Sequence, residues 1–331
     1  MLKPTVAIGL LAFSVSASAQ TYTPAGEVHI GGLGRFDYLT IDSAAKRLYL
    51  SHGTEVVVID TASNTVVGRI PGVAGVHGIA IAPNGKGFIT AGQENKVAIF
   101  DLQTMKVLMK VDTGVNPDAI VYEAKHREIY SLNHTGKSVT VIDSDSGKVT
   151  ATIPLSGVAE SGAADPELGR VYVNIEDTST VDVIDIDTHK VIANWKVTPA
   201  EEPTGMAIDT ARHRLFVGGG PSQVMLDGAT GRAVASTRIC DGTDATFFDA
   251  AASTSMSACS DGHISIIAIG PGDRMTTRQT LTTKRGARTM ALDTITHRIY
   301  TAAQDMQAAP AGGRAQGVPD TLRVLIYALA K

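Results

Sequence analysis

An internal repeat of about 42 residues constrains the fold of this chain more than any other feature. Seven anchor positions recur along the chain, and each is followed seven residues later by a large apolar residue. The anchors are Asp42, Ala82, Glu123, Asp165, Asp209, Asp249 and Asp293, and their apolar partners are Tyr49, Ile89, Tyr130, Tyr172, Phe216, Met256 and Tyr300. A period of this length indicates a repeat architecture in which no unit buries its faces alone.

A second marker recurs in phase with the anchors. In the first five units an apolar run ends in an aspartate, at Asp60, Asp101, Asp143, Asp185 and Asp227. A polar turn such as residues 144–148 follows, and then a β-branched run such as residues 149–153. Polar turns between such runs are hairpin signals. Because no helical pattern separates the units, the sequence predicts an all-β fold, a seven-bladed β-propeller with four-stranded antiparallel blades.

The two ends of the chain are predicted to close the ring. The seventh unit runs through residues 324–327 and lacks an outer strand, which we expect residues 26–30 to supply. Residues 20–331 then form a single domain. The sixth unit departs from the repeat, because it carries Ser253, Ser255 and Ser257 where bulkier residues recur elsewhere. The seventh carries an insertion at residues 304–320, which is either a surface loop or a flap over one face of the disk.

The N-terminus has the pattern of a signal peptide at residues 1–19. Lys3 precedes an apolar run at residues 6–13, and Ala17-Ser18-Ala19 supplies a cleavage signal. The alternative, an uncleaved anchor, is disfavoured because the run is too short to span a bilayer. No later stretch reaches that length. We therefore predict a periplasmic or secreted protein that begins at Gln20 and has no membrane span after cleavage.

The chain has two cysteines, Cys240 and Cys259, and neither lies in a C-x-x-C motif. A thiol redox site or zinc site is therefore not indicated, and in an exported protein a structural disulfide is the expected arrangement. Cys240 precedes the predicted inner strand of the sixth blade and Cys259 ends its second strand. Because these strands are antiparallel, both cysteines should lie toward the same face of the disk.

Ionisable residues recur at the predicted entry to each innermost strand, five residues before the anchor. These positions hold Asp37, His77, Asp118, Glu160, Thr204, Asp244 and Arg288, so six of the seven are ionisable, although charged residues make up only 19% of the chain. Strand-entry residues often only cap backbone amides. Here their identity changes from unit to unit, as around an asymmetric ligand. We predict a site for a small polar ligand or a divalent metal at one mouth of the channel, with His77, Asp118 and Glu160 as candidate metal ligands.

The loops between the second and third strands should meet the same face. They carry His52, Asn133, Asn174 and Glu176, and we place His52 and Asn133 at the rim of the site, with His52 facing His77. The competing interpretation of His52 is an isolated surface histidine. The remaining histidines considered fall at outer or turn positions and are not assigned to the site: His29, His126, His189, His213 and His297.

The repeat segments resemble the YncE-like, or YVTN-repeat, β-propeller family. The sequence Tyr172-Val173-Asn174 is the nearest match to the eponymous motif, and residues 56–60 and 140–143 match the third strand of those repeats. The resemblance implies an exported propeller without an assigned reaction, and single-stranded DNA binding in at least one branch. Without Lys3 the chain has 28 basic and 33 acidic residues, a net charge of −5, and only 5% aromatic residues. Single-strand binders need a basic groove and stacking rings, so nucleic acid is not the expected partner.

The sequence contains no G-x-S-x-G, P-loop or H-E-x-x-H motif. The leading hypothesis is therefore a binding or scaffold propeller whose partner is a small polar ligand or another exported protein. The alternative is a metal-assisted hydrolase, lyase or isomerase that uses the histidine and carboxylates of the channel mouth. Single-stranded DNA binding is the third hypothesis. A divalent metal ion is the one cofactor that the pattern indicates.

Overall fold

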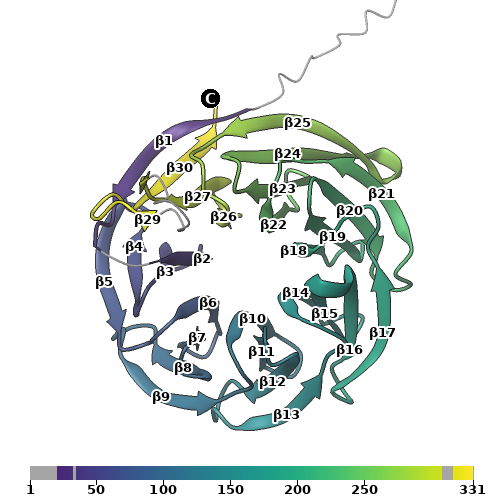
Figure 1. The fold of residues 1–331 in the computed structure, drawn as a ribbon, viewed down its shortest axis with the longest axis horizontal. Helices are drawn as coiled ribbons and strands as arrows, with labels where there is room; N and C mark the ends of the chain where they lie inside the picture. Colours follow the sequence, from purple (N-terminus) through teal and green to yellow (C-terminus); the bar gives the residue numbers. More distant parts are fainter. Residues whose placement is uncertain (1–20, 33–34, 308–315, 331) are drawn as a thin grey trace, which may run out of the picture.

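The computed structural model describes residues 21–32, 35–307 and 316–330, so the predicted signal peptide lies outside the described residues. The chain forms seven four-stranded antiparallel blades around a central channel, as predicted (Figure 1). The first strand of each blade lies nearest the channel. Within the described residues no helix is long and apolar enough to cross a membrane.

The first six blades each use four consecutive strands, ordered from the channel outward. The first blade comprises β2 (Phe36–Asp42), β3 (Arg47–His52), β4 (Glu55–Asp60) and β5 (Thr65–Pro71), and the second β6 (Val76–Ile81), β7 (Lys86–Ala91), β8 (Lys96–Asp101) and β9 (Val107–Asp112). The third comprises β10 (Pro117–Glu123), β11 (Glu128–Asn133), β12 (Ser138–Asp143) and β13 (Val149–Pro154), and the fourth β14 (Ala159–Asp165), β15 (Arg170–Ile175), β16 (Thr180–Asp185) and β17 (Lys190–Lys196). The fifth comprises β18 (Pro203–Asp209), β19 (Arg214–Gly219), β20 (Ser222–Asp227) and β21 (Ala233–Arg238), and the sixth β22 (Thr243–Asp249), β23 (Thr254–Cys259), β24 (His263–Gly270) and β25 (Arg274–Thr282). Two short 3-10 turns interrupt this pattern, η1 (Glu176–Thr178) and η2 (Pro271–Asp273).

The seventh blade closes the ring with both ends of the chain. It consists of β26 (Met290–Asp293), β27 (Arg298–Ala303), β30 (Arg323–Leu329) and, as its outer strand, β1 (Tyr22–His29). Val28 pairs with Val324 and Tyr22 with Leu329, so the predicted closure is confirmed. The closing strand begins four residues earlier than predicted and ends one residue earlier, and its pairing shifts register between Pro24 and Gly26.

The large apolar residues of the repeat form the packing between blades. Each of the seven is no more than 2% exposed. Tyr172, for example, packs with Leu215 and Val217 of the next blade, and its hydroxyl donates a hydrogen bond to the carbonyl oxygen of Gly228, at 2.7 Å. A buried tyrosine contributes apolar contact area through its ring and a hydrogen bond through its hydroxyl. At this position both link a blade to the next one, so neighbouring blades stabilise each other.

Several anchor carboxylates also link neighbouring blades. The Nδ1 atom of His213 lies 2.7 Å from Asp165, and that of His297 lies 2.5 Å from Asp249. Both aspartates are fully buried, and each partner histidine belongs to the following blade. These histidines therefore have a structural role, on contacts away from the predicted site.

The sixth blade is complete in spite of its serines. Ser255 and Ser257 are buried and hydrogen-bond to the side chain of Gln223 from the fifth blade, with Ser257 also 3.0 Å from the Thr246 hydroxyl. A polar network with its groups paired can replace apolar packing in this way. The sixth blade thus departs from the repeat because hydrogen-bonded serines replace apolar side chains in its core.

The two cysteines of this blade form a disulfide. Cys240 follows β21 and Cys259 ends β23, with their Cα atoms 5.8 Å apart, inside the range that a disulfide requires. The bond ties the loop that enters the sixth blade to the blade's second strand.

The insertion of the seventh blade is anchored at both ends. It contains the short strands β28 (Met306–Gln307) and β29 (Gln316–Gly317), which pair with each other. Asp305 forms ion pairs with Lys284 and Arg323, and Asp320 accepts a hydrogen bond from the Gly32 amide at 2.8 Å. Residues 308–315 lie outside the described part of the chain, so the predicted flap stays a prediction.

Candidate binding site at the channel mouth

β-Bulges in the innermost strands position the ring of predicted site residues. Pairing with the second strand shifts register at Phe36/Leu39, Val76/Ile79, Pro117/Ile120, Ala159/Gly162, Pro203/Gly205 and Thr243/Ala245. The ring residues fall inside these six irregularities, and Arg288 lies just before β26. A bulge leaves its extra residue unpaired and re-aims the side chain, which is how a strand that packs against two neighbours also presents a group to the channel.

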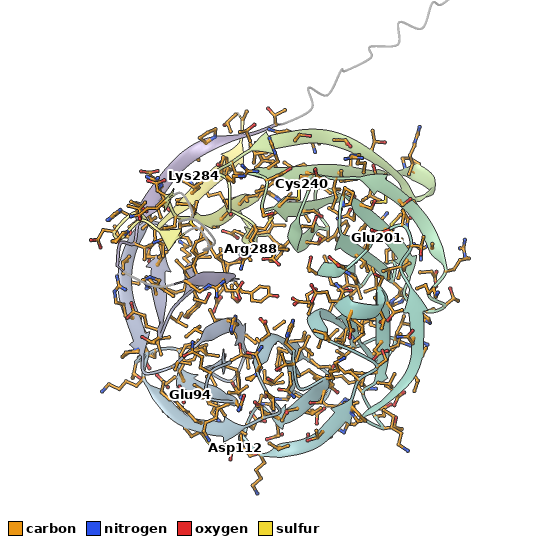
Figure 2. All side chains as sticks on the ribbon, viewed as in Figure 1. Glu94, Asp112, Glu201, Cys240, Lys284 and Arg288 are labelled. Atoms are coloured by element: carbon orange, nitrogen blue, oxygen red, sulfur yellow. A yellow bond between two sulfur atoms is a disulfide. The ribbon has the colours of Figure 1, made fainter. Side chains whose placement is uncertain are left out.

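Six of the ring residues line one cavity of about 430 Å³, which we call the mouth cavity. They are Asp37, His77, Asp118, Glu160, Asp244 and Arg288, and Arg35, Tyr38 and Gln93 also contribute to its wall. Figure 2 shows Arg288 beside the central channel. Thr204, the seventh ring residue, instead donates a hydrogen bond to the carbonyl oxygen of Thr243.

The first cluster in the mouth cavity joins three blades. The Nδ1 atom of His77 lies 2.6 Å from Asp37 Oδ2 and 3.6 Å from Asp118 Oδ1. One ligand atom from each of the three residues lies within 4.8 Å of the other two, a spacing that suits one metal ion. The Oδ1 atom of Asp118 is buried and has no hydrogen-bond partner among the residues that the structure describes. We call this group the Asp37–His77–Asp118 cluster.

Arg288 neutralises part of the opposite wall. Its guanidinium forms an ion pair with Asp244 and lies 3.8 Å from Asp37 Oδ1. The neighbouring Thr289 hydroxyl donates to the backbone carbonyl of Asp37 at 2.7 Å. The seventh blade thus holds Asp37 by both its side chain and its backbone.

A second cluster lies beside the first and contains Glu160, one of the three predicted metal ligands. Glu160 lies 3.0 Å from His134 Nε2, and Glu176 lies 3.7 Å from the same nitrogen. Ligand atoms of these three residues also lie within 4.8 Å of one another. The predicted trio of His77, Asp118 and Glu160 is therefore not the closest grouping, because Glu160 turns toward the histidine of its neighbouring blade.

Burial and like charge shift the proton equilibria of the first cluster. Burial, together with the charges of Asp37 and Glu160, raises the pKa of Asp118 to about 7. Burial opposes protonation of His77, but its hydrogen bond to Asp37 and the charge of Asp118 outweigh burial and raise its pKa above the usual value. Near neutral pH the cluster therefore holds protons that a cation can displace.

The other acids of the mouth respond to the same crowding. Burial raises the pKa of Asp244 to about 6. The charges of Asp37 and Glu160 act in the same direction, and the guanidinium of Arg288 opposes them. The hydrogen bond to Glu160 outweighs burial and raises the pKa of His134, while burial and the charge of Glu160 raise that of Glu176. These opposite charges pair locally, yet the carboxylates outnumber the cationic groups of the two clusters and the Arg288 pair. The carboxylates are Asp37, Asp118, Glu160, Glu176 and Asp244, and the cationic groups are His77, His134 and Arg288.

Tyr38 is a site residue that the sequence argument did not identify. It follows Asp37 inside the bulge of β2, yet it packs against the core cluster formed by the third and fourth blades, so its ring crosses the channel. The phenol is buried near the carboxylates of Asp118 and Glu160, and together they raise its pKa well above the usual value.

A sequence signal for Tyr38 exists in the repeat itself. The residue four before each anchor is small in the six other units, where it is Gly78, Ala119, Ser161, Gly205, Ala245 and Thr289. A single large residue in a layer of small ones marks a position that the repeat scaffold does not require. His134 also had a signal, because it follows Asn133 in a loop already assigned to the mouth face.

The two predicted rim residues lie outside the mouth cavity. His52 is only 4% exposed, with Nδ1 3.6 Å from Glu55 Oε1, and burial lowers its pKa. Asn133 is fully buried, and its amide donates to the hydroxyls of Ser138 and Thr140. Both residues end a second strand, where alternation of side chains turns them into the blade, whereas His134, one residue later, faces the mouth.

A second cavity lies deeper in the channel, and we call it the inner chamber. It has a volume of about 420 Å³ and an apolar wall that includes Ile79, Ile120, Met206, Ile208 and Phe247. Tyr38 and Asp244 line both the inner chamber and the mouth cavity. The channel therefore changes from a charged mouth to an apolar interior across Tyr38.

These features define the class of the protein as a seven-bladed β-propeller with a charged cavity at one channel mouth. The comparisons with known proteins agree with the fold. No family model matches the chain. It is 26% identical over 97 residues to the uncharacterized protein YncE of Salmonella typhi, and equally to that of Salmonella typhimurium, an alignment that covers 29% of this chain and 28% of each relative.

The matched segment spans little more than a quarter of these relatives. Together with the seven-bladed ring, it supports the predicted resemblance to YncE-like β-propellers. A chain in the crystal structure of the mitotic checkpoint complex has the same fold, with a TM-score of 0.78, 13% identity, and coverage of 100% of this chain and 99% of that one. At that identity the likeness concerns the fold alone.

Proposed function

We propose that this protein is an exported, periplasmic or secreted β-propeller that binds a divalent cation, or a polar ligand coordinated by that cation, at the Asp37–His77–Asp118 cluster. The observation that carries the proposal is the convergence of an imidazole and two carboxylates from three blades within 4.8 Å in an accessible cavity. Such convergence costs stability unless a positive charge offsets it.

A metal ion fits the donor set of the cluster. One imidazole and two carboxylates form a mixed nitrogen and oxygen set that suits Zn²⁺ or Mn²⁺ better than Ca²⁺, which prefers six or more oxygens. Within the described part of the chain Asp118 Oδ1 accepts no hydrogen bond, so it retains lone pairs for coordination. Binding would displace the protons that the raised pKa values keep on Asp118 and His77.

Titration of the purified protein with Zn²⁺ and Mn²⁺ by calorimetry tests this function. We expect one ion to bind at the first cluster, and His77→Ala and Asp118→Asn each to lower its affinity at least tenfold while the fold persists. Asp112→Asn is a matched control, because that side chain is 87% exposed and lies on the outer strand β9 (Figure 2). Unchanged affinity in both cluster variants would move the function to another part of the surface.

A second candidate function is a metal-assisted hydrolase, lyase or isomerase. The histidine–carboxylate pairs at the channel mouth, His77 with Asp37 and His134 with Glu160, favour it, because general acid–base catalysis uses such groups. A panel of p-nitrophenyl esters and phosphate esters, tested with wild-type protein and Asp118→Asn, separates the two functions. Turnover that disappears in the variant would establish an enzyme, and absence of turnover with intact metal binding supports the binding protein.

A further inference from the structure

The proposed metal site leaves the inner chamber unexplained. Its wall comes from the innermost strands of six blades, and it is mostly aliphatic and aromatic. Ligand pockets typically have volumes of 300–1,000 Å³, apolar walls and a few placed polar groups. The inner chamber and the mouth cavity both fall in that range.

The two cavities meet at Tyr38. Its ring reaches from the first blade to the core cluster of the third and fourth blades and packs against that cluster. The other six positions of this layer carry Gly, Ala, Ser or Thr, which leave space around the ring. Gly78 is small for a separate reason, since a Cβ there would lie 2.7 Å from the Asp118 carbonyl oxygen. The ring of Tyr38 therefore narrows the passage between the charged mouth cavity and the apolar inner chamber.

The change from a charged mouth cavity to an apolar inner chamber favours a ligand whose two ends differ in polarity. A wholly polar molecule would leave the apolar walls at Met206 and Phe247 in contact with water. A wholly apolar one would lie against the four carboxylates of the mouth cavity without interacting with them. A molecule with one coordinating head and one apolar body satisfies both halves of the channel.

We propose that the ligand of this propeller is a small amphiphile, whose anionic or chelating head coordinates the cation at the Asp37–His77–Asp118 cluster and whose apolar body extends past Tyr38 into the inner chamber. This inference rests on the proposed cation site. It adds the chemical class of the ligand and assigns Tyr38 and the chamber wall to its recognition.

Alkyl hydroxamates of different length test the inference on the Zn²⁺-loaded protein. Acetohydroxamate presents the chelating head alone, and hexanohydroxamate adds four methylenes. Burial of apolar surface contributes about 0.8 kcal/mol per methylene, so affinity should rise roughly fourfold with each one that enters the chamber. Affinities that do not depend on chain length would overturn the inference while leaving the cation site intact.

Filling the chamber provides the matched variants. Ala164 lines the inner chamber and is only partly buried, so Ala164→Phe should place its ring in the chamber, while Ala164→Ser keeps the volume. We expect Ala164→Phe to lose the dependence on chain length and to bind acetohydroxamate as wild type does. If that variant does not fold, Tyr38→Trp narrows the passage instead and should lose the dependence on chain length in the same way.

The outcomes separate the two proposals. Zn²⁺ binding with a chain-length effect that the bulky variants abolish supports both. A chain-length effect that persists in a folded bulky variant places the alkyl group elsewhere and overturns the chamber assignment. Failure of both Zn²⁺ and Mn²⁺ to bind the wild-type protein overturns the proposed function itself.

Discussion

Replacing Asp118 with asparagine should stabilise this protein at alkaline pH while it removes cation binding. The folded-state pKa of about 7 exceeds the ordinary aspartate value of 3.8, so ionisation of Asp118 opposes folding. The cost is nearly absent below the unfolded pKa, accumulates between about pH 4 and 7, and is complete above the folded value. Asparagine keeps the shape of the side chain and carries no charge.

The magnitude follows from the shift. About three pKa units correspond to a ceiling of about 4 kcal/mol, at 1.36 kcal/mol per unit. The net gain will be smaller, since the variant also removes a negative charge 3.6 Å from His77. We expect a gain of about 1–3 kcal/mol at pH 8, or a rise in melting temperature of roughly 2–6 °C.

Thermal denaturation of the metal-free protein at pH 8 and pH 4 measures this effect. The difference between Asp118→Asn and wild type should be large at pH 8 and below about 1 kcal/mol at pH 4, where wild-type Asp118 is protonated in the folded state. Asp112→Asn, on the exposed outer strand, should change little at pH 8. Equal or lower stability of Asp118→Asn at pH 8 would refute the conclusion that ionisation of this carboxyl group opposes folding.

Further predictions concern the second cluster, the disulfide, ring closure and the pH dependence of binding. His134→Ala should weaken binding of a second cation without changing the first, as resolved by calorimetry with excess Zn²⁺, because His134 contacts Glu160 but is not part of the first cluster. Replacing Cys240 and Cys259 together with alanine should lower the free energy of unfolding by about 3 kcal/mol, measured by urea denaturation, since the bond closes a loop of 19 residues. Deleting residues 22–29 removes the outer strand of the seventh blade, so gel filtration and thermal melts should show association or loss of the cooperative transition. Zn²⁺ affinity at the first cluster should fall as pH drops below about 7, because protons occupy the same groups, and a pH-independent affinity would contradict that assignment.

The architecture could be derived from the repeat because a β-propeller is local in sequence. Each blade is a run of neighbouring hairpins, so the spacing from Asp42 to Tyr49 repeats wherever the same strand pair forms. The same regularity located the ring residues, since six of them fall in the bulges of innermost strands and Arg288 precedes the seventh. The closing strand could also be predicted, because the seventh unit has no outer strand of its own and residues 26–30 precede the first unit as an unassigned strand.

The partners within the site depended on tertiary structure. Glu160 pairs with His134 instead of joining His77, because a bulged side chain can turn toward either neighbouring blade, and the repeat does not specify which. Asn133 and His134 differ by one position, which is enough to send one side chain into the blade and the other to the mouth. The reach of Tyr38 across the channel depends on the diameter of the closed ring. The local repeat therefore predicted the blades, their number and the positions that face the channel. Which side chains from different blades meet depends on closure of the ring, because the distances between them exist only after all seven blades have packed.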